Sequence, residues 1–373
     1  MANYNGARHL AAAMRSVLDQ SFRDLELIVS DDASSDESVA IARRLAADDR
    51  RVRVIEAPAN RGPAGARNAA LDAATGDWVA VVDSDDLIHP ERFEALIACA
   101  IRDDADIVAD DCLIFQDSGE APPATLLTGV WARRPRWIDL ATYVRQNSLN
   151  RSGPSLGYLK PLIRRELLVR NKLRYDPQLR IAEDYDLVAR LLACGARFRL
   201  TPEILYFYRK YAGSISHRLS VAPLERMIAA HEAMGLEADA VEGVRNAARI
   251  RRRSLRKALA FEHLVAALKA RAFGAAVAAV ASEPAIVRLL ARAAFERVGR
   301  RTRPAAQADD FDGRRRVVFL SRQRIVNGQS GSSAYLLAAA RAFAAHGDRV
   351  EFVCASPAAF GRTPWMRLGA ETD

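Results

Sequence analysis

Hydrophobic positions in the first 115 residues alternate between two spacings. In "RHLAAAMRSVLDQ", the apolar residues Leu10, Met14, Val17 and Leu18 recur at three- and four-residue intervals, which predicts an amphipathic helix. The run "LELIV" that follows is short and mostly apolar, which is typical of a buried strand. The same two patterns then repeat, and the expected strands are 25–29, 52–56, 78–82 and 106–115, with helices at 8–20, 34–49, 63–74 and 90–101.

The regular alternation of strand and helix predicts an α/β fold, a mostly parallel sheet with helices on both faces. Ligands of such sheets bind beyond the carboxyl ends of the strands. One expected strand ends in "IVSDDASSD", with Asp31 and Asp32, and another ends in "VVDSDD", with Asp83, Asp85 and Asp86. Both acidic clusters are therefore expected at the same edge of the sheet.

Two interpretations of these clusters are open. Asp and Ser are favoured helix N-caps, and Ser34 and Glu37 have the spacing of a capping box. Alternatively, carboxylates after two strands, with a D-x-D among them, indicate hard oxygen ligands for a divalent cation. The coincidence of two clusters favours the cation. Magnesium held by one or two carboxylates usually completes its shell with water and phosphate, which predicts a nucleoside diphosphate ligand.

The segment between the clusters, "NRGPAGARNAAL", places Arg61 and Arg67 near the start of a helix, where the free amides and the helix dipole favour anions. It lacks the G-K-[ST] ending of a phosphate-binding P-loop. This segment alone is also typical of an ordinary loop, so it supports the nucleotide hypothesis only together with the acidic clusters.

Composition excludes several classes of protein. The chain has 373 residues, half of them hydrophobic, which is enough for about two or three domains. Its longest apolar run has about nine residues, against the roughly 20 that span a bilayer, so we expect a cytoplasmic protein. Its four cysteines are widely spaced, which indicates neither a disulfide framework nor a zinc site.

The net charge of +9 is concentrated in residues 241–303, which hold 15 Lys or Arg against 4 Glu. The segment has the pattern of Ala-rich helices that carry arginine. Two interpretations are open, namely peripheral contact with an anionic membrane or acidic polymer, and a solvated helix face. A nucleic-acid partner is not expected, because interleaved aromatic residues and known nucleic-acid motifs are absent.

Five motifs in order over about 190 residues resemble the family 2 glycosyltransferases with the GT-A fold. They are "ANYNGARHLAAAMRSVLDQSF", "ELIVSDDASSDES", "NRGPAGARNAAL", "GDWVAVVDSDD" and "RIAEDYDLVARL". The resemblance implies transfer of a sugar from a nucleotide-sugar donor to an acceptor hydroxyl with inversion at the anomeric carbon, assisted by Mn²⁺ or Mg²⁺. By analogy, the basic helices after residue 240 suggest a lipid-linked or polymeric glycan acceptor at the inner face of a bacterial membrane.

The resemblance also implies roles for single residues. Tyr4 would stack near the base, and Asp32 would accept a hydrogen bond from the base edge, which favours a uridine nucleotide. Arg67 would contact the nucleotide, and Asp83 would contact the ribose or donor sugar. Asp85 would bind the metal, and Asp184 would be the catalytic base. Asp184 also fits a first-turn acid that complements the helix dipole. Trp131 and Trp137 fit either an acceptor platform or anchors in the core or at an interface.

We expect a transferase domain at 1–220, a basic helical extension at 221–303 and a linker at 304–313. At 314–373 we expect a partial unit of strand, helix and strand. The last segment resembles the start of a family 4 transferase of the GT-B type. It is too short for an α/β core of its own, so we interpret it as a cut-off second domain, inert here, with a small docked appendage as the alternative.

The opening residues "MANYNG" look like the loop after a first strand. We therefore expect a preceding strand of about five apolar residues, typical of a buried strand, with Met1 an internal or misassigned start, or the chain a fragment. Two rival functions are a magnesium-dependent phosphotransferase and a catalytically inactive nucleotide-sugar-binding module. A phosphotransferase with an aspartyl nucleophile is expected to carry D-x-D-x-[TV] after its first strand, whereas "DSDDL" follows a later one.

Overall fold

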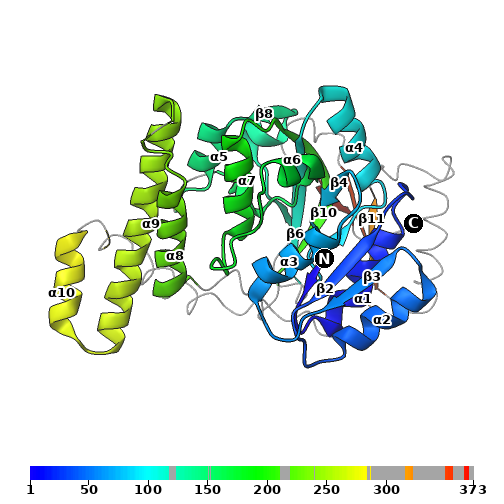
Figure 1. Cartoon of the computed structure of the whole chain (residues 1–373), viewed down its shortest axis with the longest axis horizontal. Helices are drawn as coiled ribbons and strands as arrows, with labels where there is room; N and C mark the ends of the chain where they lie inside the picture. The colour runs from blue at the N-terminus through cyan, green and yellow to red at the C-terminus, as the bar shows by residue number, and fades with distance from the viewer. Residues whose placement is uncertain are drawn as a thin grey trace. The chain divides into compact units, whose positions relative to one another are not determined.

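The computed structural model describes residues 1–116, 123–149, 151, 153–210, 219–238, 240–283 and 286, together with three strands nearer the C-terminus. The chain forms two compact units, Met1–Glu296 and Arg297–Asp373 (Figure 1). Each unit is described by itself.

A small parallel sheet opens the first unit. Its strands are adjacent in the order β1 (Ala2–Asn3), β2 (Leu27–Asp31) and β3 (Val52–Glu56), and helices α1 (Ala7–Leu18) and α2 (Ser38–Asp48) connect them. The helical spacing of α1 is confirmed, because Leu10, Met14, Val17 and Leu18 are its large buried side chains. The residues Ala2 and Asn3, which the sequence placed in a loop, pair instead as a short strand with Ser30 and Asp31.

The larger sheet has the order β4-β9-β6-β10-β5, with β7 paired to β6 and β8 paired to β10. The predicted α/β fold is confirmed, and the longest ladder of this sheet, β6 with β10, is parallel. Shorter antiparallel strands that the periodicity did not indicate complete it. The bounds are β4 (Trp78–Ala80), β5 (Leu87–Ile88), β6 (Ile107–Gln116), β7 (Ala124–Thr125), β8 (Arg136–Ile138), β9 (Leu162–Arg164) and β10 (Phe198–Lys210).

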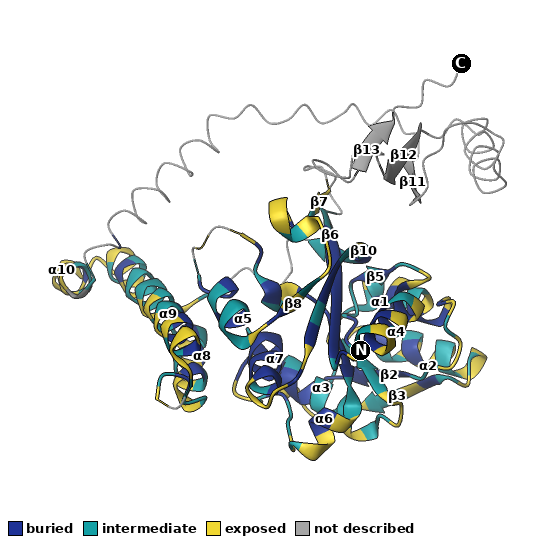
Figure 2. Cartoon of the chain, turned by 90° about the horizontal axis from the view of Figure 1, so that it is seen from above, coloured by how far each residue is buried: buried dark blue, intermediate teal, exposed yellow. Residues whose placement is uncertain are grey.

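Helices cover both faces of the larger sheet. Figure 2 shows α1 and α4 on one side of β6 and α5 and α7 on the other, with the buried strand residues between them. Because both faces are covered, β6 is buried at every position from Ile107 to Leu113, Asp110 and Asp111 included, rather than at alternate positions. The remaining bounds are α3 (Gly62–Ala73), α4 (Arg92–Asp103), α5 (Leu140–Gln146), α6 (Arg165–Arg170) and α7 (Glu183–Ala193), with short 3₁₀ turns at Gly129–Ala132 and Leu156–Tyr158.

The expected capping box before α2 does not form. The helix begins at Ser38, and the Glu37 side chain does not cap it. Ser34 lies too far upstream, and its hydroxyl donates instead to Oδ1 of Asp31 at 2.6 Å. The start of α2 is supported by Asp36, whose Oδ1 accepts from the Ser38 N–H at 3.0 Å. The first acidic cluster is therefore partly used to shape the turn after β2.

The helical extension packs in the same compact unit as the sheets, where α8 (Val221–Ala233), α9 (Glu242–Lys269) and α10 (Phe273–Ser282) follow one another (Figure 1). Helix α9 contacts both α5 and α8. Its Arg251 is buried, donates to the backbone oxygen of Asn147, and places its guanidinium 3.6 Å from the centroid of the Tyr185 ring. Within the described residues, no helix is long and apolar enough to cross a bilayer.

A cavity of about 460 Å³ lies beside both sheets of the first unit. Leu27 and Ile28 of β2 and Trp78 and Val79 of β4 line it, together with Met1. In the described part of the chain these strands belong to two separate sheets, and the cavity lies beside strands of both. The expectation about a preceding strand stays a prediction.

In the second unit, β11 (Arg316–Ser321) and β12 (Arg349–Ala355) are parallel neighbours, and β13 (Trp365–Leu368) is antiparallel to β12. The parallel pair agrees with the expected strand–helix–strand unit. The helix predicted between the two strands lies outside the described residues, and so does the linker 304–313. The expected resemblance of this unit to family 4 transferases stays a prediction.

One buried carboxyl of the larger sheet generates a pH-dependent prediction. Oδ1 of Asp111 accepts from the N–H groups of Cys112 at 2.7 Å and Leu127 at 2.8 Å, and burial raises the pKa of Asp111 from 3.8 to about 7. The folded state therefore holds a proton that the unfolded chain releases, so this group stabilises the fold below pH 4 and loses that contribution as the pH rises to about 7.

We expect Asp111→Asn, which keeps the accepting oxygen, to gain stability relative to the parent as the pH rises from 4 to 7, and to be more stable above pH 7 by about 2–4 kcal/mol. Urea unfolding at a series of pH values measures this. Asp48→Asn, at the end of α2, is the matched control. A stability difference that does not change with pH would contradict the prediction.

Candidate active site

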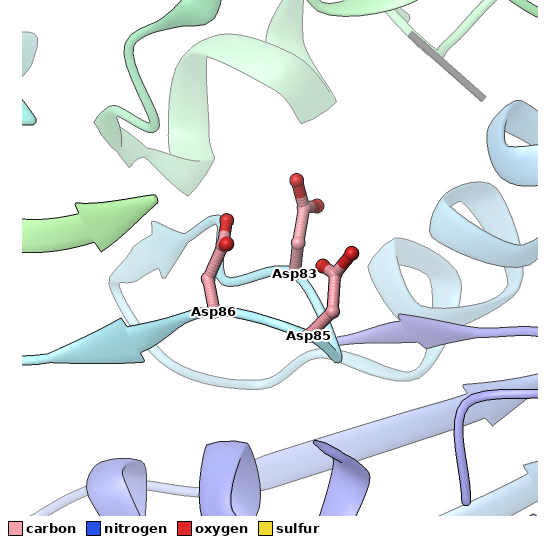
Figure 3. Close-up of side chains that lie close together, drawn as sticks. All are labelled: Asp83, Asp85 and Asp86. Carbon is pink, nitrogen blue, oxygen red and sulfur yellow. The ribbon is translucent and has the colours of Figure 1, made fainter. Parts of the chain in front are cut away.

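The second acidic cluster lies in the loop between β4 and β5. Each of Asp83, Asp85 and Asp86 offers a carboxylate oxygen, and these oxygens lie within 4.8 Å of one another. Figure 3 shows the three side chains rising from the loop toward the same side. The structure thus brings together the D-x-D that the sequence indicated. The three side chains nevertheless have different surroundings.

Asp86 anchors the loop through buried hydrogen bonds. Its side chain is buried, and its carboxylate accepts from the Tyr206 hydroxyl and from the Arg209 N–H, both at 2.7 Å. The Tyr206 hydroxyl in turn accepts from the Asp83 N–H at 3.1 Å. Burial raises the pKa of Asp86 well above its ordinary value, and the charges of Asp83 and Asp85 raise it further. Tyr206, at the end of β10, therefore fixes the backbone that carries the two more exposed carboxylates.

A buried arginine supports this layer. Arg92, at the start of α4, makes a bidentate pair with Asp110 of β6, at 2.7 and 3.0 Å. Its guanidinium lies 4.9 Å from the centroid of the Tyr206 ring, and it also donates to the backbone oxygen of Lys160. One fully buried cation thus connects the sheet, the tyrosine under the acidic loop and the segment that follows the 3₁₀ turn at Leu156–Tyr158.

Asp83 is paired with two cations. Its carboxylate lies 2.8 Å from Lys160 Nζ and 2.9 Å from Arg67 Nη2. Burial opposes ionisation of Asp83, but the nearby charges of Lys160 and Arg67 outweigh it and hold the pKa of this carboxyl well below its ordinary value. Asp83 is therefore an anion at neutral pH.

Asp184 contacts the same two cations as Asp83, but from α7 rather than from the acidic loop. It lies in the first turn of α7, and its Oδ2 accepts from Lys160 Nζ at 2.7 Å. Its Oδ1 lies 3.6 Å from Arg67 Nη1 and, among the described residues, has no hydrogen-bond partner although it is buried. Arg67 Nη1 donates to the neighbouring Glu183. Residues distant in sequence, Asp83 and Asp184, thus share the cations Lys160 and Arg67.

The predicted nucleotide residues lie at the carboxyl end of the small sheet. Asp32 is buried, and its two oxygens accept from the N–H groups of Arg61 at 2.8 Å and Gly62 at 2.7 Å. Gly62 has a φ of 78°, which suits glycine and directs its N–H to Asp32. Tyr4 follows β1 and is half exposed. The roles predicted for Tyr4 and Asp32 stay predictions, and Asp32 also holds the start of α3.

Sequence reasoning missed Lys160, Glu183, Tyr206 and Arg209. One signal for Lys160 was available in the sequence. Only five of the 55 basic residues are lysines, so a lysine at this position departs from the preference of the chain for arginine. Tyr206 and Arg209 carry no local signal, since they reach the acidic loop only through the pairing of β10 with β5 and β6.

The two tryptophans contact arginines. Trp137 of β8 pairs with Arg199 near the start of β10, roughly 20 Å along the strand from Tyr206 at 3.3 Å per residue. Its ring lies against Arg197 and Arg199, with guanidinium distances of 4.9 and 5.1 Å to the centroid. Arg136 lies over the Trp131 ring at 4.6 Å. For Trp137 these contacts favour the structural interpretation.

The acidic loop fits a hard divalent cation. Its donor atoms are carboxylate oxygens, which suit Mg²⁺ and Mn²⁺. Asp86 is buried and accepts from Tyr206 and Arg209, and the role of Asp85 as the metal ligand stays a prediction.

Comparison with known proteins agrees with this geometry. Residues 1–168 match the model of Glycosyl transferase family 2. The succinoglycan biosynthesis protein ExoO of Rhizobium meliloti (strain 1021) is 38% identical over 291 residues, which cover 78% of this chain and 82% of that protein. The chain belongs to glycosyltransferase family 2. A second relative of this transferase, the succinoglycan biosynthesis protein ExoU of the same organism, is 35% identical over 76% of this chain and 83% of that protein.

Two solved structures share the fold of this glycosyltransferase. The mannosyltransferase PcManGT from Pyrobaculum calidifontis, in complex with GDP-Man and Mn²⁺, has a TM-score of 0.52 at 18% identity over 80% of this chain and 79% of that one. S. aureus TarS 1-349, in complex with UDP-GlcNAc, has a TM-score of 0.51 at 22% identity over 70% of this chain and 69% of that one.

The support under the acidic loop can be tested through Tyr206. We expect Tyr206→Phe to lower the free energy of unfolding by about 1–3 kcal/mol, because the Asp86 carboxylate and the Asp83 N–H both lose a buried partner. We also expect weaker binding of Mn²⁺, because the loop is less fixed.

Thermal unfolding and calorimetric titration with Mn²⁺ measure the two effects. Tyr158→Phe is the control, since that side chain is exposed, and its stability should stay within about 0.5 kcal/mol of the parent. A Tyr206→Phe protein with parental stability and Mn²⁺ affinity would show that the loop does not depend on this hydroxyl.

Proposed function

We propose that this glycosyltransferase moves a sugar from a nucleotide sugar, preferentially a UDP-sugar, to a hydroxyl of a bacterial polysaccharide or lipid-linked glycan, with inversion at the anomeric carbon. The observation that carries the proposal is the pairing of Asp83 and Asp184 through Lys160, at 2.8 and 2.7 Å. This pairing supports the proposal, because Asp184, the proposed base, then shares a cation with a carboxylate of the acidic loop. A phosphotransferase of the aspartyl type would not need this second carboxylate.

The proposed reaction uses the two sides of the site, namely Asp184 on α7 and the acidic loop between β4 and β5. Asp184 accepts the proton of the acceptor hydroxyl while the acceptor oxygen bonds to the anomeric carbon. The bond from that carbon to the diphosphate oxygen breaks, and the nucleoside diphosphate leaves. Arg67 would contact the nucleotide, and Asp83 would contact the ribose or donor sugar.

A divalent cation, Mn²⁺ or Mg²⁺, would be held by Asp85. When bound, it neutralises charge on the leaving diphosphate. The hard oxygen donors of the loop support this assignment. Among the fold neighbours, the Pyrobaculum mannosyltransferase was solved with Mn²⁺.

The polysaccharide acceptor is supported by the names of both Rhizobium relatives, which are succinoglycan biosynthesis proteins. Peripheral contact with an anionic membrane, at the inner face of the cell membrane, would bring the transferase to a lipid-linked acceptor. The residues proposed for it lie on α9, where Arg249 and Arg253 are exposed one helical turn apart. Arg251 of the same helix is buried and does not contribute.

Donor binding and chemistry can be separated by two substitutions. We expect UDP with Mn²⁺ to raise the melting temperature of the parent, whereas Asp85→Asn should lose this shift, because the cation links the loop to the diphosphate. Asp184→Asn should keep the shift and lose about 10²–10⁴-fold in kcat, because only the base is removed.

Differential scanning fluorimetry with UDP, GDP, CDP and dTDP, each with and without Mn²⁺, measures binding, and release of nucleoside diphosphate from the matching sugar nucleotides measures turnover. Asp48→Asn is the control and should match the parent in both. Equal stabilisation by all four nucleotides without Mn²⁺ would contradict the UDP-sugar proposal.

The membrane contact predicts that Arg249→Glu with Arg253→Glu reduces binding to vesicles of phosphatidylglycerol and phosphatidylcholine by at least about tenfold, at about 1 kcal/mol per basic residue. Co-sedimentation measures the binding, and pure phosphatidylcholine vesicles give the background. The control is Arg44→Glu with Arg50→Glu, which makes the same charge change at exposed residues near the end of α2. Equal loss in both double variants would show an effect of net charge alone.

A further inference from the structure

We propose that Lys160 is a positioning residue for sugar transfer, which holds Oδ2 of Asp184 so that Oδ1 of the same carboxylate receives the acceptor's proton. This inference rests on the proposed function of Asp184 as the base. Lys160 lies in none of the motifs that identified the site.

The backbone of Lys160 is fixed from two sides. The fully buried Arg92 donates to its carbonyl oxygen. Just before it, the Gly157 N–H donates to Oδ1 of Asn147 at 2.6 Å, and a Cβ at Gly157 would lie 2.8 Å from that oxygen and 3.3 Å from Cβ of Tyr185. The 3₁₀ turn therefore packs tightly against α5 and α7, and it delivers the lysine side chain to a set position.

The ammonium of Lys160 lies between two carboxylates, Asp83 of the acidic loop and Asp184 of α7. Its side chain is 7% exposed, and Nζ lies 2.8 Å from Asp83 Oδ2 and 2.7 Å from Asp184 Oδ2. A guanidinium is larger and planar, whereas an ammonium is a point charge that fits between two carboxylates. Only five of the 55 basic residues are lysines, so a lysine here departs from the preference of the chain for arginine.

The two oxygens of Asp184 are thereby distinguished. Oδ2 is occupied by Lys160, whereas Oδ1 is buried, lies 3.6 Å from Arg67 Nη1, and is without a hydrogen-bond partner among the described residues. A buried acceptor without a partner is costly unless a ligand supplies the donor. A hydroxyl group of the acceptor is such a donor. Lys160 restrains rotation of the carboxylate, and because it also contacts Asp83, it fixes the base relative to the donor side of the site.

A second explanation of the same geometry is that Lys160 contacts the donor diphosphate after binding. The two explanations differ in the kinetic parameter that they affect. A positioning residue for the base affects kcat, since the base acts only in the transition state, whereas a donor contact present in the bound complex raises the donor KM.

The test compares Lys160→Met with Lys172→Met, which makes the same change at an exposed lysine after α6. The probes are UDP-glucose, UDP-galactose and UDP-GlcNAc with Mn²⁺, and the acceptors are water and octyl β-D-glucoside. Release of UDP gives kcat and the donor KM. We expect Lys160→Met to lose about 100-fold in kcat, because a misplaced base costs that much, with the donor KM within about threefold of the parent.

A smaller variant keeps the test independent of folding damage. Lys160→Ala leaves space for a free amine, so added ethylammonium should restore part of kcat, whereas it should not change the parent or Lys172→Met. Rescue supports a role for the ammonium itself, which a purely structural role would not show. Lack of rescue in a folded Lys160→Ala protein would overturn the proposal.

Two further outcomes distinguish failure of the positioning role from failure of the proposed function. If the parent is active and Lys160→Met retains its kcat, or loses affinity for the donor alone, the positioning role is wrong and the proposed function stands. If the parent releases UDP from none of the donors, the proposed function fails, and the role of Lys160 in transfer fails with it.

Discussion

The organisation of the site depends on one constraint: carboxylates gathered in a largely buried place must be neutralised before a ligand arrives. Asp83, Glu183 and Asp184 lie close together, and Arg67 and Lys160 supply the opposing charges. Removing one partner from a buried pair costs about 3–5 kcal/mol, because the remaining charge is left without compensation. The cations that neutralise these carboxylates are therefore also the groups that hold Asp184, the proposed base, and Asp83 in fixed positions.

A second buried layer transmits this order to the acidic loop. Arg92 and Asp110 form a pair with side chains 0% and 1% exposed, under the ring of Tyr206. The hydroxyl of Tyr206 binds Asp86 and the backbone of Asp83. Of the three aspartates in the loop, Asp86 is thus buried and stabilises the loop by hydrogen bonds, whereas Asp83 and Asp85 are more exposed. Fold stability and site geometry share the same side chains.

The basic helical extension shows how net charge misleads when it is counted along the chain. Arg251 is buried against Tyr185 and Asn147, next to the helix that carries Asp184. Arg252 and Arg256 pair with acidic residues of the segment before α9, at 2.8 and 2.9 Å. Part of the positive charge therefore attaches the extension to the rest of the unit, and only the exposed arginines remain for an anionic partner.

The sequence by itself determined the α/β class, the helix of Leu10, Met14, Val17 and Leu18, and the D-x-D that follows the strand at Trp78. Those features follow from the periodicity of apolar residues and from residues that are neighbours in the chain. The sequence placed both acidic clusters at the edge of one parallel sheet, whereas β2 and β4 belong to two different sheets. Only the tertiary structure decided that Lys160 joins Asp83 to Asp184, that Asp86 turns inward, and that Ser34 does not cap α2. These contacts join residues that are far apart in the chain or compete locally for one partner, and their outcome depends on packing that no local pattern encodes.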